Sequence, residues 1–121
     1  MAKMLNETVG NVGYDGLIIS NFPEADVVTV TLAAGQGVVK RGSLVVGTAG
    51  GSLSVIAKAL TATDAAYVLT DDTDTAGGAV TATAYRVGHF AKNKLVTGAY
   101  TLVAADEELL RKSGILLGDI L

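Results

Sequence analysis

The stretch Val27–Gly47 constrains the fold more than any other part of the chain. Across Val28–Leu32, aliphatic side chains alternate with threonines, so that an extended backbone has one apolar face and one hydroxylated face. This alternation predicts a half-buried strand. The two glycines within Ala33–Gly37 permit a tight reversal, and the apolar pattern resumes at Val38–Val39 and at Leu44–Val46. We therefore expect a hairpin or a β-corner in this stretch.

Lys40, Arg41 and Gly42 interrupt the second apolar arm. A glycine beside two cations is typical of a turn or bulge, which would carry both charged side chains into solvent. The glycines of this region, Gly35, Gly37 and Gly42, lack the GxGxxG spacing of a phosphate-binding loop, and no helix is expected to follow them. We therefore expect no nucleotide site.

Composition favours a β-rich domain. A chain of 121 residues is long enough for one domain with its own core, and 50% of its residues are hydrophobic whereas 5% are aromatic. Abundant valine, threonine and glycine with a single proline indicate many strands and turns. We predict an α+β, β-rich fold, in which residues 17–121 form one small, compact β-sheet or barrel-like domain. It has one short C-terminal helix and an extended, flexible N-terminal arm over residues 1–16.

Charge and cysteine content exclude several kinds of partner and site. The net charge is -3, the cations form no basic stripe, and aromatic residues are too few to stack bases, so we expect no direct contact with nucleic acid. The absence of cysteine excludes disulfides, thiol catalysis and thiolate metal sites. The first ten residues lack the apolar segment of a signal peptide, and no run approaches the roughly 18 apolar residues of a membrane span. We expect a soluble protein, made in the cytoplasm, with no membrane partner.

The first sixteen residues, Met1–Gly16, contain three glycines and few large apolar side chains. Such a segment cannot offset its ordering entropy by burial, so we expect an extended arm. Two interpretations stay open. The arm is frayed or pinned along its own domain, or it becomes ordered on a partner by adding backbone hydrogen bonds to an exposed sheet edge.

Further strands are expected where short apolar runs lie between turn residues. These are Leu17–Ser20, Leu53–Leu60, Ala66–Leu69, Val80–Val87 ended by Gly88, and Ile115–Leu121, with shorter extended pieces at Leu95–Val96 and Tyr100–Val103. The alanines of Leu53–Leu60 also suit a helix, but its length and flanking glycines favour a strand. The closing Ile115–Leu121 is too apolar for a solvated tail, so we expect it in the sheet or against a neighbouring subunit.

The segment Asp106–Ser113 predicts the one helix. Asp106 is expected to cap the free amides of the first turn. Two glutamates follow it at the positive end of the helix dipole, and two basic residues precede Gly114 at the negative end.

Asp71, Asp72 and Asp74 form the one carboxylate cluster outside the predicted helix. A calcium loop that began at Asp72 would need oxygen ligands at its fifth position and a bidentate acid at its twelfth, where the chain has alanine and threonine. We interpret the cluster as a solvated turn, with an adventitious weak cation site as the alternative. His89 lacks a cysteine or serine partner in a recognisable arrangement, so we expect it at the surface or in a subunit interface. We expect no catalytic residue, no cofactor site and no metal site.

Four phrases follow one another over about 100 residues. They are VTLAAGQGVVKRGSLV at Val30–Val45, AYVLTDDTDT at Ala66–Thr75, AYRVGHFAKNKL at Ala84–Leu95 and LRKSGILL at Leu110–Leu117. In this order the chain resembles the head decoration proteins of tailed bacteriophages, the family typified by the capsid-stabilising protein of phage lambda. The shared pattern places an acidic segment before a Tyr-x-x-Gly-x-Phe phrase, followed by a C-terminal helix and strand. The chain departs from the lambda protein in having no tryptophan and a different arm sequence.

The resemblance implies a homotrimer that is made in the host cytoplasm and bound to the outer surface of the expanded icosahedral capsid, at three-fold and quasi-three-fold positions. Its partner would be the major capsid protein, and it would stabilise the shell against internal DNA pressure without chemistry. The arm residues expected to dock on capsid strands are Lys3, Met4, Leu5, Thr8 and Val9. The residues expected near the subunit interface are Tyr85, Arg86, His89 and Phe90.

A second class of function is a stand-alone β-rich module that binds a carbohydrate or a cell-surface ligand. It would use the loops Asn21–Asp26 and Asp71–Gly78, in which Phe22 is the sole aromatic residue. An enzyme ranks third, because the sequence offers no nucleophile and base in a recognisable arrangement.

Overall fold

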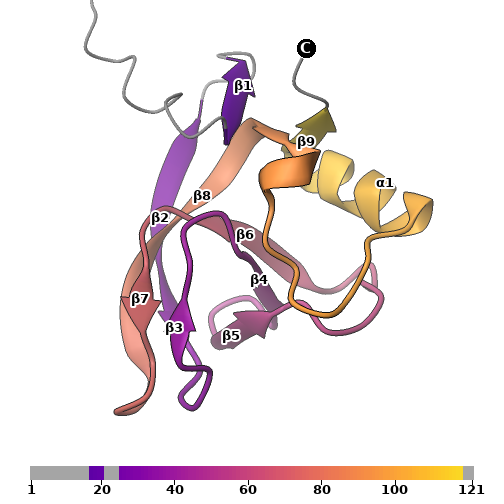
Figure 1. The fold of residues 1–121 in the computed structure, drawn as a ribbon. Coiled ribbons are helices and arrows are strands. Elements are labelled where there is room, and N and C mark those ends of the chain that lie inside the picture. Colours follow the sequence, from indigo (N-terminus) through magenta and orange to yellow (C-terminus); the bar gives the residue numbers. More distant parts are fainter. Residues whose placement is uncertain (1–16, 21–24, 119–121) are drawn as a thin grey trace, which may run out of the picture.

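The computed structural model of the protein describes residues 17–20 and 25–118, in which strands predominate and one α-helix lies near the C-terminal end (Figure 1). The strands are β1 (Ile18–Ser20), β2 (Asp26–Leu32), β3 (Val38–Val39), β4 (Leu44–Gly47), β5 (Ser52–Val55), β6 (Ala65–Leu69), β7 (Thr73–Asp74), β8 (Val80–Ala91) and β9 (Ile115–Gly118). The helical elements are the 3₁₀ turn η2 (Lys92–Lys94) and the helix α1 (Ala104–Ser113). The predicted α+β, β-rich class with a short helix near the C-terminus is confirmed.

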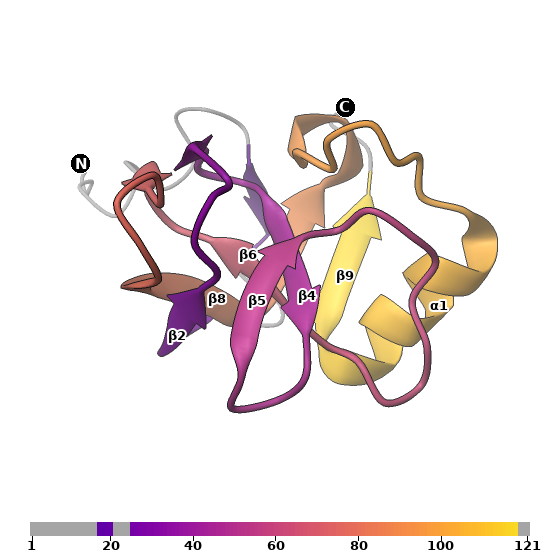
Figure 2. The ribbon, with the colours of Figure 1, turned by 90° about the horizontal axis from the view of Figure 1, so that it is seen from below.

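Five strands pair in a closed circuit, which makes the main sheet barrel-like. Around the circuit the order is β8, β2, β5, β4 and β6, and β6 pairs again with β8. The pairing of β2 with β5 is parallel, and the other pairings of the circuit are antiparallel. Viewed from below in Figure 2, β9 and α1 lie beside β4, on one side of this barrel. Closure removes sheet edges that would otherwise leave backbone groups unpaired.

Two cores lie on opposite faces of β4 and β6. The barrel core contains the buried residues Leu32, Val39, Val45, Leu53 and Leu69. The outer core, beside α1, β1 and β9, contains Leu17, Leu44, Ile56, Ala66, Val68, Tyr85, Phe90, Leu110 and Ile115. Neighbours in one strand therefore enter different cores, as Leu44 and Val45 do in β4. A strand that is buried on both faces has a continuous apolar run instead of an alternating one, which explains the apolar runs of β4 and β6.

A bulge in β8 determines which core the second half of the strand contributes to. Opposite β2, Val27 pairs with Tyr85 and Asp26 pairs with Val87, so Arg86 is the extra residue. In a regular strand, Tyr85 and Phe90 would point to opposite faces because they are five residues apart. The extra residue brings both rings to the outer core, where their centroids lie 5.5 Å apart.

β8 continues to Ala91, although the sequence predicted its end at Gly88. Its first half lies between β2 and β6, and its second half lies between β1 and β9. A side chain at position 88 would collide with a core ring, because a Cβ there would lie 2.7 Å from Cζ of Phe90. The glycine is therefore not a strand terminator. It makes room for the buried ring.

Of the two alternatives expected within Val27–Gly47, a hairpin or a β-corner, the hairpin does not form. β3 pairs with β7 in a separate two-stranded sheet, while β4 pairs with β5 and β6. β2 cannot take β3 as a neighbour along its C-terminal end, because β8 and β5 already occupy its two sides there. Gly35 and Gly37, whose φ angles are +83° and +68°, lead the chain out of the barrel sheet instead.

The remaining strand predictions differ from the structure mainly at their ends. β5 ends at Val55 and not at Leu60. Leu95–Val96 contributes a single bridge to Ser43, and Tyr100–Val103 is not a strand. β9 pairs with β8, which confirms a strand after the helix and places it in the sheet. Of the loop expected at Asn21–Asp26, residues 21–24 lie outside the described residues, and its last residue begins β2.

α1 begins at Ala104, two residues before the predicted start, and ends at Ser113 as predicted. Gly114 has a φ of +103° and closes the helix with backbone hydrogen bonds to the last turn. Within the described part of the chain, no helix combines the length and the apolar character needed to cross a membrane.

We predict that Gly88→Ala lowers the free energy of unfolding by about 1–3 kcal/mol, because the added methyl group overlaps the buried Phe90 ring. Urea denaturation followed by circular dichroism measures the change. The matched control is Gly77→Ala, which adds the same methyl group where no atom lies within 4 Å. Equal effects of the two substitutions would contradict this account of Gly88.

Candidate functional site

Two of the four residues expected near a subunit interface belong to the core. Phe90 is 0% exposed and Tyr85 is 7% exposed, and their rings pack at a tilt of 52°. Within the single chain, Phe90 therefore has no exposed surface for a neighbouring subunit, and Tyr85 has little. The bulge that turns both rings inward is the physical reason, and it has no local signal in the sequence.

The other two residues, Arg86 and His89, lie at the surface or partly exposed. Arg86 is the bulged residue of β8, and its Nε donates a hydrogen bond to Oδ2 of Asp26 at 3.0 Å. Both members of this ion pair are exposed, so the pair adds little to stability. The role of Arg86 and His89 in a subunit interface stays a prediction.

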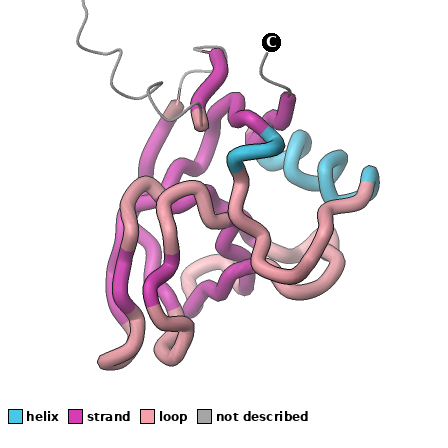
Figure 3. Tube along the Cα trace, in the orientation of Figure 1, coloured by secondary structure: helices cyan, strands magenta, loops and turns pink. Residues whose placement is uncertain are grey.

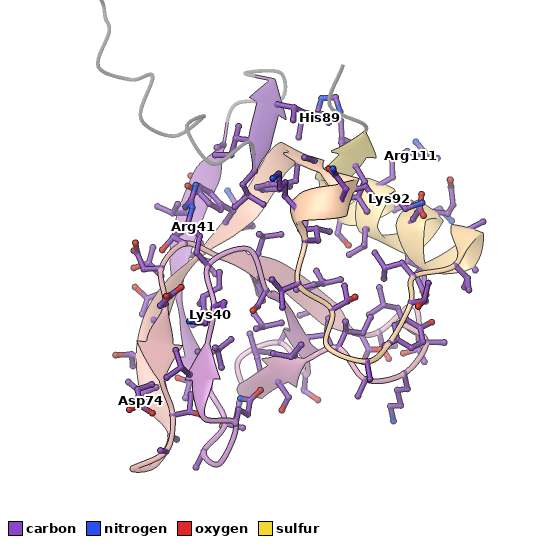
Figure 4. The ribbon with its side chains drawn as sticks, viewed as in Figure 1. Lys40, Arg41, Asp74, His89, Lys92 and Arg111 are labelled. Atoms are coloured by element: carbon purple, nitrogen blue, oxygen red, sulfur yellow. The ribbon has the colours of Figure 1, made fainter. Side chains whose placement is uncertain are left out.

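His89 lines a shallow groove between α1 and β9. The groove has a volume of about 470 Å³ and is lined by His89, Ala104, Glu107, Glu108, Arg111, Leu116 and Leu117. Figure 4 shows His89 near β9 and Arg111 beside α1. Gly118 leaves space for the imidazole, because a Cβ on that glycine would lie 2.9 Å from Nε2 of His89.

Ion pairs surround the groove. Nζ of Lys92 lies 2.6 Å from Oε2 of Glu107, and Arg111 forms an ion pair with Glu108 within α1. The hydrogen bond from Arg111 holds the pKa of Glu108 below its usual range, and the same hydrogen bond raises the pKa of Arg111. A ligand would therefore meet paired charges, one imidazole and two leucines.

The two adjacent cations Lys40 and Arg41 lie in different environments, although both were expected in solvent. Lys40 is exposed, and its Nζ lies 3.7 Å from Oδ2 of Asp72. Arg41 is only partly exposed. Its guanidinium lies over the Tyr85 ring, 5.9 Å from the centroid, and Nη1 donates to the carbonyl oxygen of Thr70 at 2.8 Å. The predicted turn is present, but Arg41 turns back onto the domain because an aromatic face and a carbonyl lie within its reach.

The acidic loop binds its own backbone and neighbours. Asp72 Oδ1 accepts a hydrogen bond from the Arg41 N–H at 2.8 Å, and Asp74 Oδ1 accepts one from the Ala76 N–H at 2.9 Å. Asp71 Oδ2 accepts from the Thr70 hydroxyl at 3.0 Å. Within the described ranges, no group of three or more His, Cys, Asp or Glu side chains converges to hold a metal ion.

Asp106 has a buried role that the sequence did not reveal. It was expected at the N-cap, but it is the third residue of α1, and it is 1% exposed. Its carboxylate accepts hydrogen bonds from the Tyr100 hydroxyl, from the Leu60 N–H at 2.9 Å and from the Val103 N–H at 3.0 Å. An acid at the third helical position accepts a hydrogen bond from the N-cap N–H, as in a capping box. The sequence pattern of a capping box also needs a polar side chain at the N-cap, and Val103 has none. The sequence therefore did not indicate the true start of the helix.

The Asp106 carboxylate fixes two long loops to the start of α1. These loops precede β6 and α1 and are drawn in pink in Figure 3. Burial alone would raise the pKa of Asp106, but the hydrogen bonds from Tyr100, Leu60 and Val103 outweigh burial and hold it below its usual range. The hydrogen bond that the Tyr100 hydroxyl donates to Asp106 raises the pKa of the Tyr100 phenol.

The arm residues expected to dock on a capsid, Lys3, Met4, Leu5, Thr8 and Val9, lie outside the described residues. No family model matches the chain, and no curated protein matches it significantly.

We predict that Asp106→Asn lowers the free energy of unfolding at pH 7 by about 1–3 kcal/mol, because the neutral amide accepts three hydrogen bonds less well. Folding lowers the pKa of Asp106, so its contribution is fully present above the ordinary value of about 3.9 and is lost as pH falls through the lowered value. The gap between wild type and variant should therefore shrink in urea titrations from pH 7 to pH 3. Glu108→Gln is the control, and its loss should be smaller at every pH, because the ion pair of Glu108 with Arg111 is exposed on the same helix. A gap that is independent of pH would contradict the prediction.

We predict that Arg41→Ala lowers the free energy of unfolding by about 1–2 kcal/mol, because it removes the stacking on Tyr85 and the hydrogen bond to Thr70. Lys40→Ala is the matched control, since it removes the adjacent, exposed cation. Thermal and urea denaturation of both variants measure the difference. A loss that is as large for Lys40→Ala would refute the distinction.

Proposed function

We propose that this chain is a capsid decoration protein, which binds as a homotrimer to the outer surface of the expanded phage head at three-fold and quasi-three-fold positions. The observation that carries the proposal is the order of the four sequence phrases that resemble the decoration family. They are Val30–Val45, Ala66–Thr75, Ala84–Leu95 and Leu110–Leu117. Their described parts run through β2–β4, β6–β7, β8–η2 and α1–β9 in turn, so the resemblance spans one β-rich body. The partner is the major capsid protein, and no cofactor takes part.

The leading residues Met1–Gly16 are proposed to dock on the capsid. They join the body at Leu17, which is 2% exposed in the outer core. The Leu17 carbonyl oxygen accepts a hydrogen bond from the Ala91 N–H at 2.7 Å. Because Leu17 is buried and hydrogen-bonded to β8, a force on the docking segment is transmitted to the β body.

Trimerisation makes weak docking strong. Each backbone hydrogen bond to the capsid contributes only about 0.5–1.5 kcal/mol net. Three docking segments on one rigid body make the second and third contacts intramolecular, which raises the overall affinity by roughly 10²–10⁴. Because the trimer binds the assembled lattice and not dispersed subunits, binding stabilises the shell by mass action.

We predict that deletion of residues 1–16 leaves a folded trimer that no longer coats capsids, because the docking segment is lost while both cores remain. Co-sedimentation with undecorated expanded heads measures coating, and circular dichroism and analytical ultracentrifugation of the truncated protein control for folding and assembly.

Normal coating by the truncated protein would rule out the docking role of the arm. A full-length protein that fails to pellet with the heads would rule out decoration itself. Retention of a monomeric protein on a glycan matrix would favour the stand-alone binding module.

A further inference from the structure

Two loops that pass beside α1 are held to the domain by few apolar contacts (Figure 2). The first loop is residues 57–64, before β6, and the second loop is residues 97–102, before α1. Neither loop contains a strand, a helix or a buried residue. Three partly buried side chains, Leu60, Tyr100 and Leu102, pack against the outer core. Segments with so few buried contacts open more easily than the strands of a core.

One carboxylate accepts the hydrogen bonds that attach both loops. Within the described ranges, the one hydrogen bond from the first loop to another element runs from the Leu60 N–H to Oδ1 of Asp106, at 2.9 Å. The second loop is attached by the Tyr100 hydroxyl, which donates to Oδ2 of Asp106. Val103, the N-cap residue that follows the second loop, donates its N–H to the same oxygen at 3.0 Å.

The helix that carries the carboxylate is held independently of the first loop. A pocket of about 300 Å³ lies between this loop and α1, with Leu60 on one side and Leu109 and Lys112 on the other. α1 is fixed instead by Leu110, which is 1% exposed in the outer core, and by β9, which follows the helix and pairs with β8. The hydrogen bond to Asp106 is therefore a main link between the first loop and the helix.

Burial of the carboxylate couples the two loops. Asp106 is 1% exposed while both loops donate to it. If either loop leaves, water reaches the carboxylate and competes for the hydrogen bonds that remain. The other loop then loses the advantage of bonding to a charge in a dry environment. Both loops therefore remain closed together or open together.

We infer that the first loop and the second loop form one flap, latched by Asp106, which opens as a unit while the barrel and α1 stay folded. Opening exposes Leu60, Tyr100 and Leu102 and uncovers the part of the outer core against which they pack. The flap gives the domain a second conformation with apolar surface that the closed form hides. The inference concerns contacts within one chain and does not depend on the proposed function.

Tyr100→Phe tests the inference, because it weakens the second loop alone. The variant keeps the ring but removes the hydroxyl that donates to Oδ2 of Asp106, whereas the Leu60 N–H donates to Oδ1. NMR-detected hydrogen exchange of the full chain follows the N–H groups of Leu60 and Val103. Exchange of both groups should accelerate by the same factor, about tenfold or more, because a hydrogen bond to a charged group is lost.

Val45→Ala is the matched control. Val45 is fully buried in the barrel core, to which no residue of either loop belongs. Its truncation leaves a cavity that destabilises the whole domain. Amides of β4 and β6 should therefore exchange faster in this variant, whereas exchange at Leu60 and Val103 should remain as in the wild type, because the flap opens without global unfolding.

The wild type gives a second test if Tyr100→Phe does not fold. In urea concentrations below the unfolding transition, the N–H groups of Leu60 and Val103 should share one opening free energy. Its dependence on urea should be weaker than that of the barrel amides, because opening the flap exposes less surface than global unfolding.

Three results would overturn the flap. Tyr100→Phe that accelerates exchange at one of the two N–H groups, or at neither, would show that the loops are not coupled. Val45→Ala that accelerates exchange at both groups would show that they exchange by global unfolding. Different opening free energies in the wild type would show that the loops open separately. None of these results bears on the coating of capsids, so the proposed function is tested separately.

Discussion

The bulge at Arg86 is the constraint on which the arrangement of the two cores depends. β8 contributes small side chains to the barrel, such as Ala82, and an aromatic ring, Phe90, to the outer core. A regular strand would send residues 82 and 90 to the same face, so the outer core would keep Tyr85 but lose the Phe90 ring. One extra residue changes the face, and Gly88 then provides the space that the Phe90 ring requires. The place of Phe90 in the outer core beside Tyr85 follows from this single change of register.

Buried polar groups hold the loops to this framework in unequal ways. Asp106 accepts three hydrogen bonds from the loops that precede β6 and α1. These hydrogen bonds fix both loops to the start of α1. Ser43, by contrast, is 1% exposed, and its hydroxyl has no hydrogen-bond partner among the described residues. Its backbone lies where β4, β6 and the chain at Val96 meet, since the Ser43 carbonyl accepts from Leu69 and its bridge partner is Val96. Three backbone segments meet at Ser43, so a small side chain fits there. The buried serine hydroxyl without a hydrogen-bond partner is unfavourable for stability.

The proposed function depends on binding surfaces and on the mechanical integrity of the β body, and it involves no catalytic step. Both cores share β4, β6 and β8, so in the proposed function a force on the proposed docking segment reaches the whole β body through Leu17. The groove at His89 lies on the same body, between α1 and β9.

The sequence alone determined the features that depend on neighbouring residues. The alternation in Val28–Leu32 specifies a half-buried strand, and the charges around α1 with Gly114 at its end specify the helix, because side-chain period and helix dipole act locally. Only the tertiary structure decided which strands pair, why Lys40 is solvated while Arg41 binds Tyr85 and Thr70, and that Asp106 is buried. The contacts of Arg41 with Thr70 and Tyr85 and of Leu60 with Asp106 join residues 29 to 46 positions apart, and a local pattern carries no information about such partners.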